Sequence, residues 1–165
     1  MAVNARQGIV RVLDSKGNLQ RTIGEIGMAE HQFFYSISTV DEDGNYYIII
    51  FLKMTAIWSN ISIKMPRCSV GSYGMKTREF LHPISLALGE ASIYVLDNET
   101  QLVQHFDREG QFPQQFWRGG YGQGAFLTTL NISALGKIGL VYVLDYGNYQ
   151  VQRFDALGNY QTCWG

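Results

Sequence analysis

Two aspartates at matching positions of a repeated pattern are the first residues that suggest chemistry. Asp97 follows the run Ile-Tyr-Val-Leu, and Asp145 follows Val-Tyr-Val-Leu. Carboxylates placed alike could act as general acids or bases, or could bind a metal ion. Aspartates after strands also bond the backbone N–H groups of their own turns. The repeated context favours this structural role for turn residues Asp97, Asp107, Asp145, Asn148 and Asp155.

Histidines and cysteines do not form a metal-binding pattern. His31, His82 and His105 occupy different positions of the repeat, and no pair of them has ligand spacing. Cys68 and Cys163 are far apart and are interpreted as half-buried thiols. No Gly-x-Ser-x-Gly nucleophile motif occurs. The sequence therefore predicts no metal, no cofactor and no catalytic residue.

A glycine-rich stretch at residues 120–124, Gly-Tyr-Gly-Gln-Gly, resembles a loop that cradles phosphate. Phosphate loops of that kind lead into the N-terminus of a helix. Residues 126–130 instead have the composition of a strand. We interpret residues 120–124 as a flexible loop between sheets.

An internal repeat of about 47 residues organises the chain. Gly24, Gly71, Gly119 and Gly165 are separated by 47, 48 and 46 residues. Residues 93–98 match residues 141–146, and residues 103–110 match residues 151–158, both at an offset of 48. Two further periodic sets are Gly27, Gly74 and Gly122, and Phe33, Phe80 and Phe126. Each repeat reads as four short strands joined by turns, which is the composition of a propeller blade.

The matched segments resemble the NHL repeat. The resemblance covers residues 119–126, 141–155 and Gly158, and it extends to residues 71–110 with Phe80, Pro83 and Asp97. It implies an all-β fold, a β-propeller of the six-bladed type. We expect an incomplete arc of about three to four antiparallel blades in one domain, 1–165, with repeat phases near 9–56, 57–102, 103–150 and 151–165.

One repeat departs from this pattern. At the position of Asp97 it has Ile50, and at that of Asp107 it has Asn60. An arc of about three and a half blades leaves open sheet edges, which favour self-association. Three interpretations follow: a piece of a longer protein, closure of a ring with a second copy, or an open arc.

Two types of loop share one face of a propeller, and the alignment predicts which residues lie there. Tyrosine and arginine are common at binding surfaces. The predicted loop-face binding residues are Tyr73, Lys76, Arg78, His82, Arg118, Tyr121, Tyr146 and Tyr149.

Three classes of function fit this face. The first is a non-catalytic interaction module that binds protein or peptide. The alternatives are an RNA-binding NHL-type module and a fragment of a lyase or lactone-hydrolase-like propeller enzyme. A net charge of −1 gives no general attraction to nucleic acid.

Targeting and membrane signals are absent from the sequence. Its longest apolar run, residues 46–52, is shorter than the roughly 20 residues that a membrane helix needs, and we interpret it as a buried strand. No secretory signal is visible at the first residues, which favours the cytoplasm.

Overall fold

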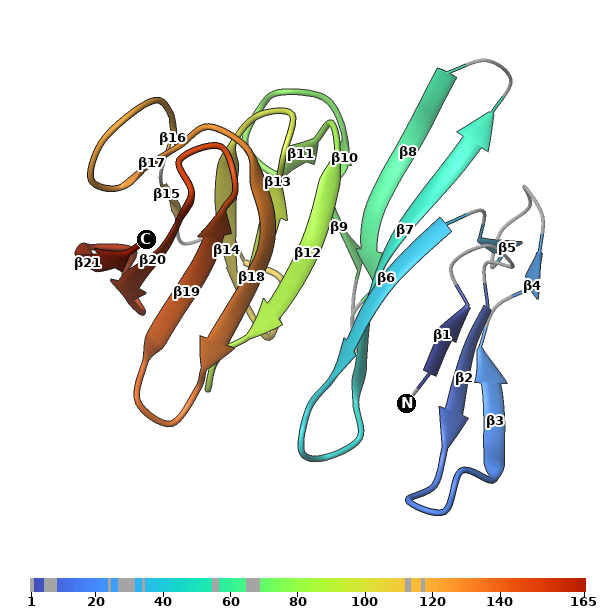
Figure 1. The fold of residues 1–165 in the computed structure, drawn as a ribbon. Coiled ribbons are helices and arrows are strands. Elements are labelled where there is room, and N and C mark those ends of the chain that lie inside the picture. Colours follow the sequence, from blue (N-terminus) through green and yellow to red (C-terminus); the bar gives the residue numbers. More distant parts are fainter. Residues whose placement is uncertain are drawn as a thin grey trace. The chain divides into compact units, whose positions relative to one another are not determined.

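The structure is a computed structural model that describes residues 2–4, 9–23, 25–26, 32–33, 35–54, 57–64, 69–111, 114–116 and 118–165. These residues form strands and turns without any helix, which confirms the predicted all-β class (Figure 1). Consequently none of them belongs to a helix that could cross a membrane. The chain divides into two compact units, Met1–Tyr73 and Gly74–Gly165.

The second unit contains two antiparallel sheets, each built from four consecutive strands. The first sheet consists of β12 (Pro83–Leu88), β13 (Ser92–Asp97), β14 (Leu102–Asp107) and β15 (Gln114–Phe116). The second consists of β18 (Thr129–Leu135), β19 (Leu140–Asp145), β20 (Gln150–Asp155) and β21 (Tyr160–Trp164). The short strand β11 (Glu79–Phe80) precedes the first sheet, and the parallel pair β16 (Arg118–Gly119) and β17 (Ala125–Phe126) precedes the second.

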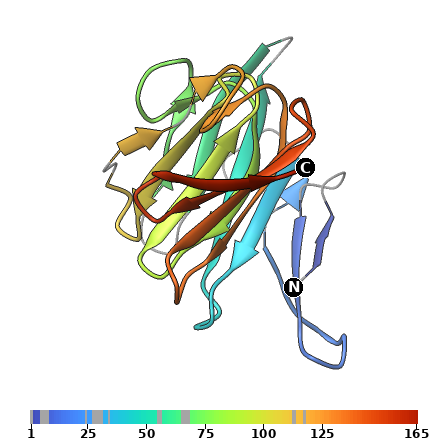
Figure 2. The same cartoon turned by 60° about the vertical axis from the view of Figure 1, so that its left-hand side comes forward.

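These two sheets lie face to face in the second unit (Figures 1 and 2). The core between them contains Tyr94, Leu96 and Val103 from the first sheet. From the second sheet it contains Ile132, Val141, Val143 and Phe154. Side chains alternate across a strand, so every second residue of β13 and β19 enters this core.

The segments that lead into the two sheets, residues 74–82 and 119–128, show which glycines occupy equivalent positions of the repeat. The Gly74 N–H donates to the Phe80 carbonyl at 3.0 Å, and the Gly120 N–H donates to the Phe126 carbonyl at 2.7 Å. Gly120, rather than Gly122, is therefore the structural equivalent of Gly74. The offset is 46 residues before the first hairpin of each sheet and 48 after it, because the β18–β19 hairpin is two residues longer than the β12–β13 hairpin.

The first unit contains a three-stranded and a four-stranded antiparallel sheet. The first consists of β1 (Ala2–Asn4), β2 (Ile9–Leu13) and β3 (Leu19–Ile23). The second consists of β6 (Tyr35–Val40), β7 (Tyr46–Met54), β8 (Ile57–Lys64) and β9 (Ser69–Val70). A parallel pair, β4 (Glu25–Ile26) and β5 (Gln32–Phe33), lies between them in sequence, and β10 (Ser72–Tyr73) follows.

The repeat without its polar turn still forms a four-stranded sheet. The apolar run lies in β7, where Tyr47, Ile48 and Ile49 are buried. Asn60 lies within β8 opposite Leu52, so it does not hold the turn position that the alignment gave it. β7 has nine residues and β8 has eight, whereas β13 and β14 have six each. Apolar and β-branched residues continue the strand pairing where an aspartate ends it in the other repeats.

Candidate binding surface

One edge of the second unit gathers two lead-in loops, residues 74–82 and 119–128, and two turns, residues 98–101 and 146–149. We call this set the loop edge. The Gln101 side chain donates a short hydrogen bond to the Leu127 carbonyl, and the Thr129 hydroxyl donates to Asn98 Oδ1 at 3.5 Å. These bonds connect the turn of the first sheet to the lead-in loop of the second.

Asp97 anchors the first half of the loop edge. Its carboxylate is fully buried and accepts four backbone hydrogen bonds. Oδ2 accepts from the N–H groups of Leu81 at 2.7 Å and His82 at 3.1 Å. Oδ1 accepts from Glu99 and Thr100, both at 3.0 Å. The carboxylate thereby ties the lead-in loop to the turn after β13, and its oxygens are committed to the scaffold.

Asp145 anchors the second half with a different set of donors. Oδ1 accepts from the N–H groups of Leu127 at 3.2 Å and Thr128 at 3.4 Å. Oδ2 accepts from the side-chain amides of Asn148 at 2.6 Å and Gln152 at 3.3 Å. The carboxylate is again fully buried. Two of its four donors are therefore side chains, and the N–H groups of its own turn do not contribute.

Two buried glutamines, which the sequence interpretation did not single out, complete the scaffold. Gln104 donates to the Glu79 carbonyl at 2.6 Å and accepts from the Arg78 N–H at 3.0 Å. In the same way, Gln152 donates to the Ala125 carbonyl at 2.7 Å and accepts from the Gly124 N–H at 2.9 Å. The signal was present as the shared Val-Gln pair at the start of each matched segment.

Tyrosines project from this scaffold into solvent. Tyr121 is 83% exposed, Tyr149 is 79% exposed, and Tyr146 is also exposed. The rings of Tyr146 and Tyr149 lie 5.9 Å apart. Tyr149 has φ of +54° and Arg78 has φ of +67°, a conformation that is uncommon for residues other than glycine. Backbone held in such a state is a frequent mark of ligand-binding positions.

Most of the predicted loop-face residues belong to segments of the loop edge, and their role in binding stays a prediction. Two of the eight are not assigned to the loop edge: Tyr73 belongs to the first unit, and the side chain of Arg118 lies outside the described residues although its backbone pairs with Ala125. The six that share the loop edge are Lys76, Arg78, His82, Tyr121, Tyr146 and Tyr149.

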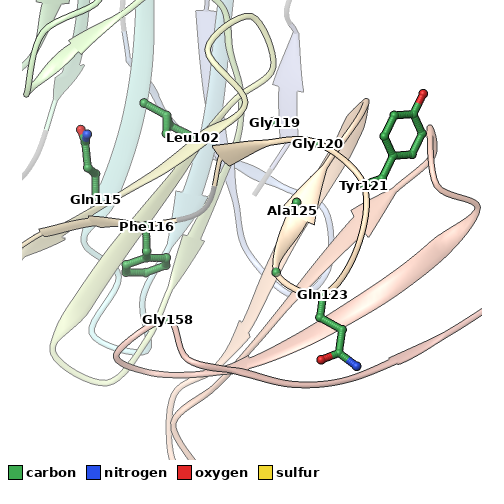
Figure 3. Close-up of a pocket in the computed structure, with 10 residues that line it drawn as sticks. Leu102, Gln115, Phe116, Gly119, Gly120, Tyr121, Gln123, Ala125 and Gly158 are labelled. Atoms are coloured by element: carbon green, nitrogen blue, oxygen red, sulfur yellow. The ribbon is translucent and has the colours of Figure 1, made fainter.

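A hollow of about 760 Å³ opens beside the glycine-rich loop (Figure 3). Phe116 lies at its base over the turn at Gly158, and the Tyr121 ring points away from Phe116. Gln115 and Gln123 add two amide side chains to the lining. The remaining lining residues are Leu102, Gly119, Gly120, Gly124 and Ala125. Sequence reasoning found only the loop side of this hollow, because β14 and β15 contribute the opposite side.

The described residues do not meet the side-chain requirement of a metal site or the backbone requirement of a phosphate site. In the part of the chain that the structure describes, no group of three or more His, Cys, Asp or Glu side chains could hold a metal ion. The glycine-rich loop leads into β17 and then β18, so no helix dipole faces it.

The sequence matches no protein-family model and no curated protein.

Proposed function

We propose that this chain is an interaction module that binds a protein or peptide through the loop edge of an NHL-like β-propeller. Sheets of four consecutive antiparallel strands, a period of about 47 residues and face-to-face packing in the second unit all support the propeller assignment. The repeated Val-Gln-x-Phe-Asp and Tyr-Val-Leu-Asp segments support the NHL resemblance.

The observation that carries the proposal is the contrast between exposed tyrosines and the rigid backbone beneath them. Tyr121 and Tyr149 are mostly exposed, while the Asp145 and Gln152 side chains that fix their loops are fully buried. Tyrosine offers a large contact area at a low entropic cost, and a preformed loop reduces the cost further. Such residues are frequent binding hot spots.

The hollow beside Tyr121 supports a peptide rather than a flat partner. Phe116 and Leu102 supply apolar surface, while Gln115 and Gln123 supply hydrogen-bonding amides. This lining suits one apolar side chain of a bound segment together with its adjacent backbone. Tyr121 at the rim would then stack on the same segment.

Selection from a phage-displayed library of random peptides tests this function. We expect clones whose affinity falls by about 30-fold in the double variant Tyr121→Ser/Tyr149→Asn, which corresponds to the loss of a hot spot. Asparagine suits the positive φ at position 149. The matched control is Ile138→Ala, since Ile138 is 63% exposed but lies in the β18–β19 hairpin at the other end of the sheet.

Two results would contradict the proposal. In the first, no clone depends on the two tyrosines. In the second, the same double variant leaves peptide binding intact but loses retention of a random single-stranded RNA pool, which would assign the loop edge to RNA.

A further inference from the structure

The second sheet of the second unit has a face that points away from the core and carries apolar and aromatic side chains around one charged residue, Arg153, whose guanidinium lies 5.6 Å from the centroid of the Trp164 ring. Val141 and Val143 enter the core, so Tyr142 and Leu144 lie on the opposite face. Leu144 pairs with Val151, which pairs with Trp164. Leu144 is 41% exposed and Trp164 is 50% exposed. We call Tyr142, Leu144, Val151 and Trp164 the outer face; it is separate from the loop edge.

The repeat shows what kind of surface covers such a face. Residues 48 positions earlier, Tyr94, Leu96, Val103 and Phe116, form the same face of the first sheet. Tyr94, Leu96 and Val103 are fully buried against the β18–β21 sheet, and Phe116 packs beside them. Apart from Arg153, which stands where the first sheet has His105, the outer face thus has the composition of the covered face, and its natural cover is another antiparallel sheet.

In the second unit, the turn between β20 and β21 makes two specific contacts with the covered face of the first sheet. The Tyr94 hydroxyl donates to the Ala156 carbonyl at 3.0 Å. The Phe116 ring lies so close to Gly158 that a Cβ there would be 2.4 Å from a ring carbon. A cover for the outer face must therefore present an Asp-x-x-Gly turn with a bare glycine and an accessible carbonyl.

The turn between β2 and β3 has these properties. Asp14-Ser-Lys-Gly-Asn-Leu-Gln lies 141 residues before Asp155-Ala-Leu-Gly-Asn-Tyr-Gln, which is three repeats of 47. Asp14 Oδ1 accepts from the N–H groups of Lys16 and Asn18 at 2.9 Å. Asp155 Oδ1 accepts from the equivalent two groups at the same distances.

This N-terminal turn is also open. No described atom lies within 4 Å of a Cβ placed on Gly17, whereas Gly158 is pressed against Phe116. Leu19, the equivalent of the half-buried Tyr160, is exposed. The chain therefore carries both halves of the same type of interface, one on β2–β3 and one on β18–β21.

We propose that two copies of this chain associate head to tail, with the β2–β3 turn of one copy on the outer face of the other. Gly17 then packs on Trp164, as Gly158 packs on Phe116. The Ser15 carbonyl accepts from the Tyr142 hydroxyl, as the Ala156 carbonyl accepts from Tyr94. The interface joins two different surfaces of the chain. It therefore forms twice in a closed dimer, or once between each pair of neighbours in an open series of copies.

Sedimentation velocity over a wide range of protein concentration tests the association. The wild-type chain should associate as its concentration rises. Leu144→Lys should weaken association by about 100-fold or more, because it places an unpaired charge in the buried interface. Ile138→Lys, a substitution of an exposed apolar residue outside the outer face, should leave association unchanged.

Disulfide trapping tests the proposed contact itself. In a background with Cys68→Ser and Cys163→Ser, a Gly17→Cys chain is mixed with a Trp164→Cys chain and oxidised with diamide. A Cβ on Gly158 would lie 2.4 Å from the ring carbon that is bonded to the Cβ of Phe116, so cysteines at the equivalent positions can bring their Cβ atoms within the separation that a disulfide requires. We expect a disulfide-linked pair of the two different chains.

Gly44→Cys is the matched control for trapping, because Gly44 is a turn glycine with φ of +81° and no described atom within 4 Å of its Cβ position. It should cross-link to Trp164→Cys far more slowly than Gly17→Cys does. The proposal is overturned by a wild-type chain that stays monomeric, by association that survives Leu144→Lys, or by equal rates for the two cysteine positions. None of these results bears on peptide binding at the loop edge.

Discussion

The two sheets of the second unit share one pattern and differ in their surroundings. Tyr94 and Leu96 of β13 are buried, whereas Leu144 of β19 is 41% exposed although its neighbours along the strand are equally apolar. The sequence of each repeat thus specifies a sheet with two faces suited to burial. Whether a face is buried depends on the next sheet, because side chains of one strand cannot cover each other.

A second difference lies in the anchoring carboxylates. Asp97 accepts only from backbone N–H groups, which are fixed by the fold. Asp145 accepts two of its four bonds from side chains. The Asn148 amide can rotate, whereas the Gln152 amide is held by its bonds to the backbone of residues 124–125. The neighbours of Asp145 can therefore adapt to a substitution better than those of Asp97. The loss of stability on substituting each aspartate measures this difference.

The largest expected effect separates Asp97→Asn from Asp145→Asn. An asparagine at position 97 must point its amide at two backbone donors and leave them unsatisfied, at a cost of about 3 kcal/mol. At position 145 the Asn148 amide can turn its oxygen toward the new donor, so we expect a smaller loss of about 1 kcal/mol. Urea denaturation measures both losses.

The control for this comparison removes the adaptable partner. Combining Asp145→Asn with Asn148→Ala should raise its cost toward that of Asp97→Asn, because the rotating acceptor is lost. Equal losses for the two single variants would show that the side-chain donors of Asp145 give no such tolerance.

The next effect compares two turn glycines at equivalent positions. Gly158 and Gly17 have φ of +82° and +85°, so alanine strains both by about 1 kcal/mol. At Gly158 the new Cβ also overlaps the Phe116 ring, and we expect a total loss of about 2 kcal/mol. Thermal or urea denaturation at low protein concentration measures the losses in the unassociated chain.

Phe116→Ala provides the check on this interpretation. In that background Gly158→Ala should cost no more than Gly17→Ala, because the overlap is gone. A difference that persists without the ring would place its cause in the backbone of the turn.

Much of the all-β character could be predicted because the signals are local. Alternating β-branched and aromatic residues give β13, β14, β19 and β20, and each of these strands ends at an aspartate. The segments of the loop edge also follow in outline from the repeat, since matching positions of a repeat occupy matching places. The binding role of the residues on them stays a prediction.

The rest depended on contacts that a sequence does not display. Two of the four donors to each of Asp97 and Asp145 come from lead-in loops 15 to 18 residues away. The other two donors differ between these nearly identical motifs. The two extra residues of the β18–β19 hairpin shift the glycine alignment, which a fixed period cannot reveal. The long β7–β8 pairing arose where a polar turn was missing, and an alignment to the other repeats could not place it.

The smallest effect concerns His105, whose equivalent in the second sheet is Arg153. The His105 imidazole stacks on Tyr94 at 4.9 Å and its Nε2 lies 2.8 Å from the Ser92 hydroxyl. Its Nδ1 is buried and has no hydrogen-bond partner among the described residues. Burial lowers the pKa of His105 below its usual value of 6.5, and the nearby charge of Asp107 only partly opposes this.

The sign of the pH effect follows from the lowered pKa. Below about pH 6.5 the unfolded chain takes up the proton before the folded chain does, so stability falls as the pH falls until the folded pKa is passed. Urea midpoints should decline between pH 7 and 5, and His105→Gln should reduce that decline. Arg153→Gln is the matched control, since a guanidinium keeps its charge over this range and its loss should leave the decline intact. A decline that is unchanged by His105→Gln would mean that the covered face of the first sheet tolerates an imidazolium. Burial of that face would then not disfavour a charge at position 105.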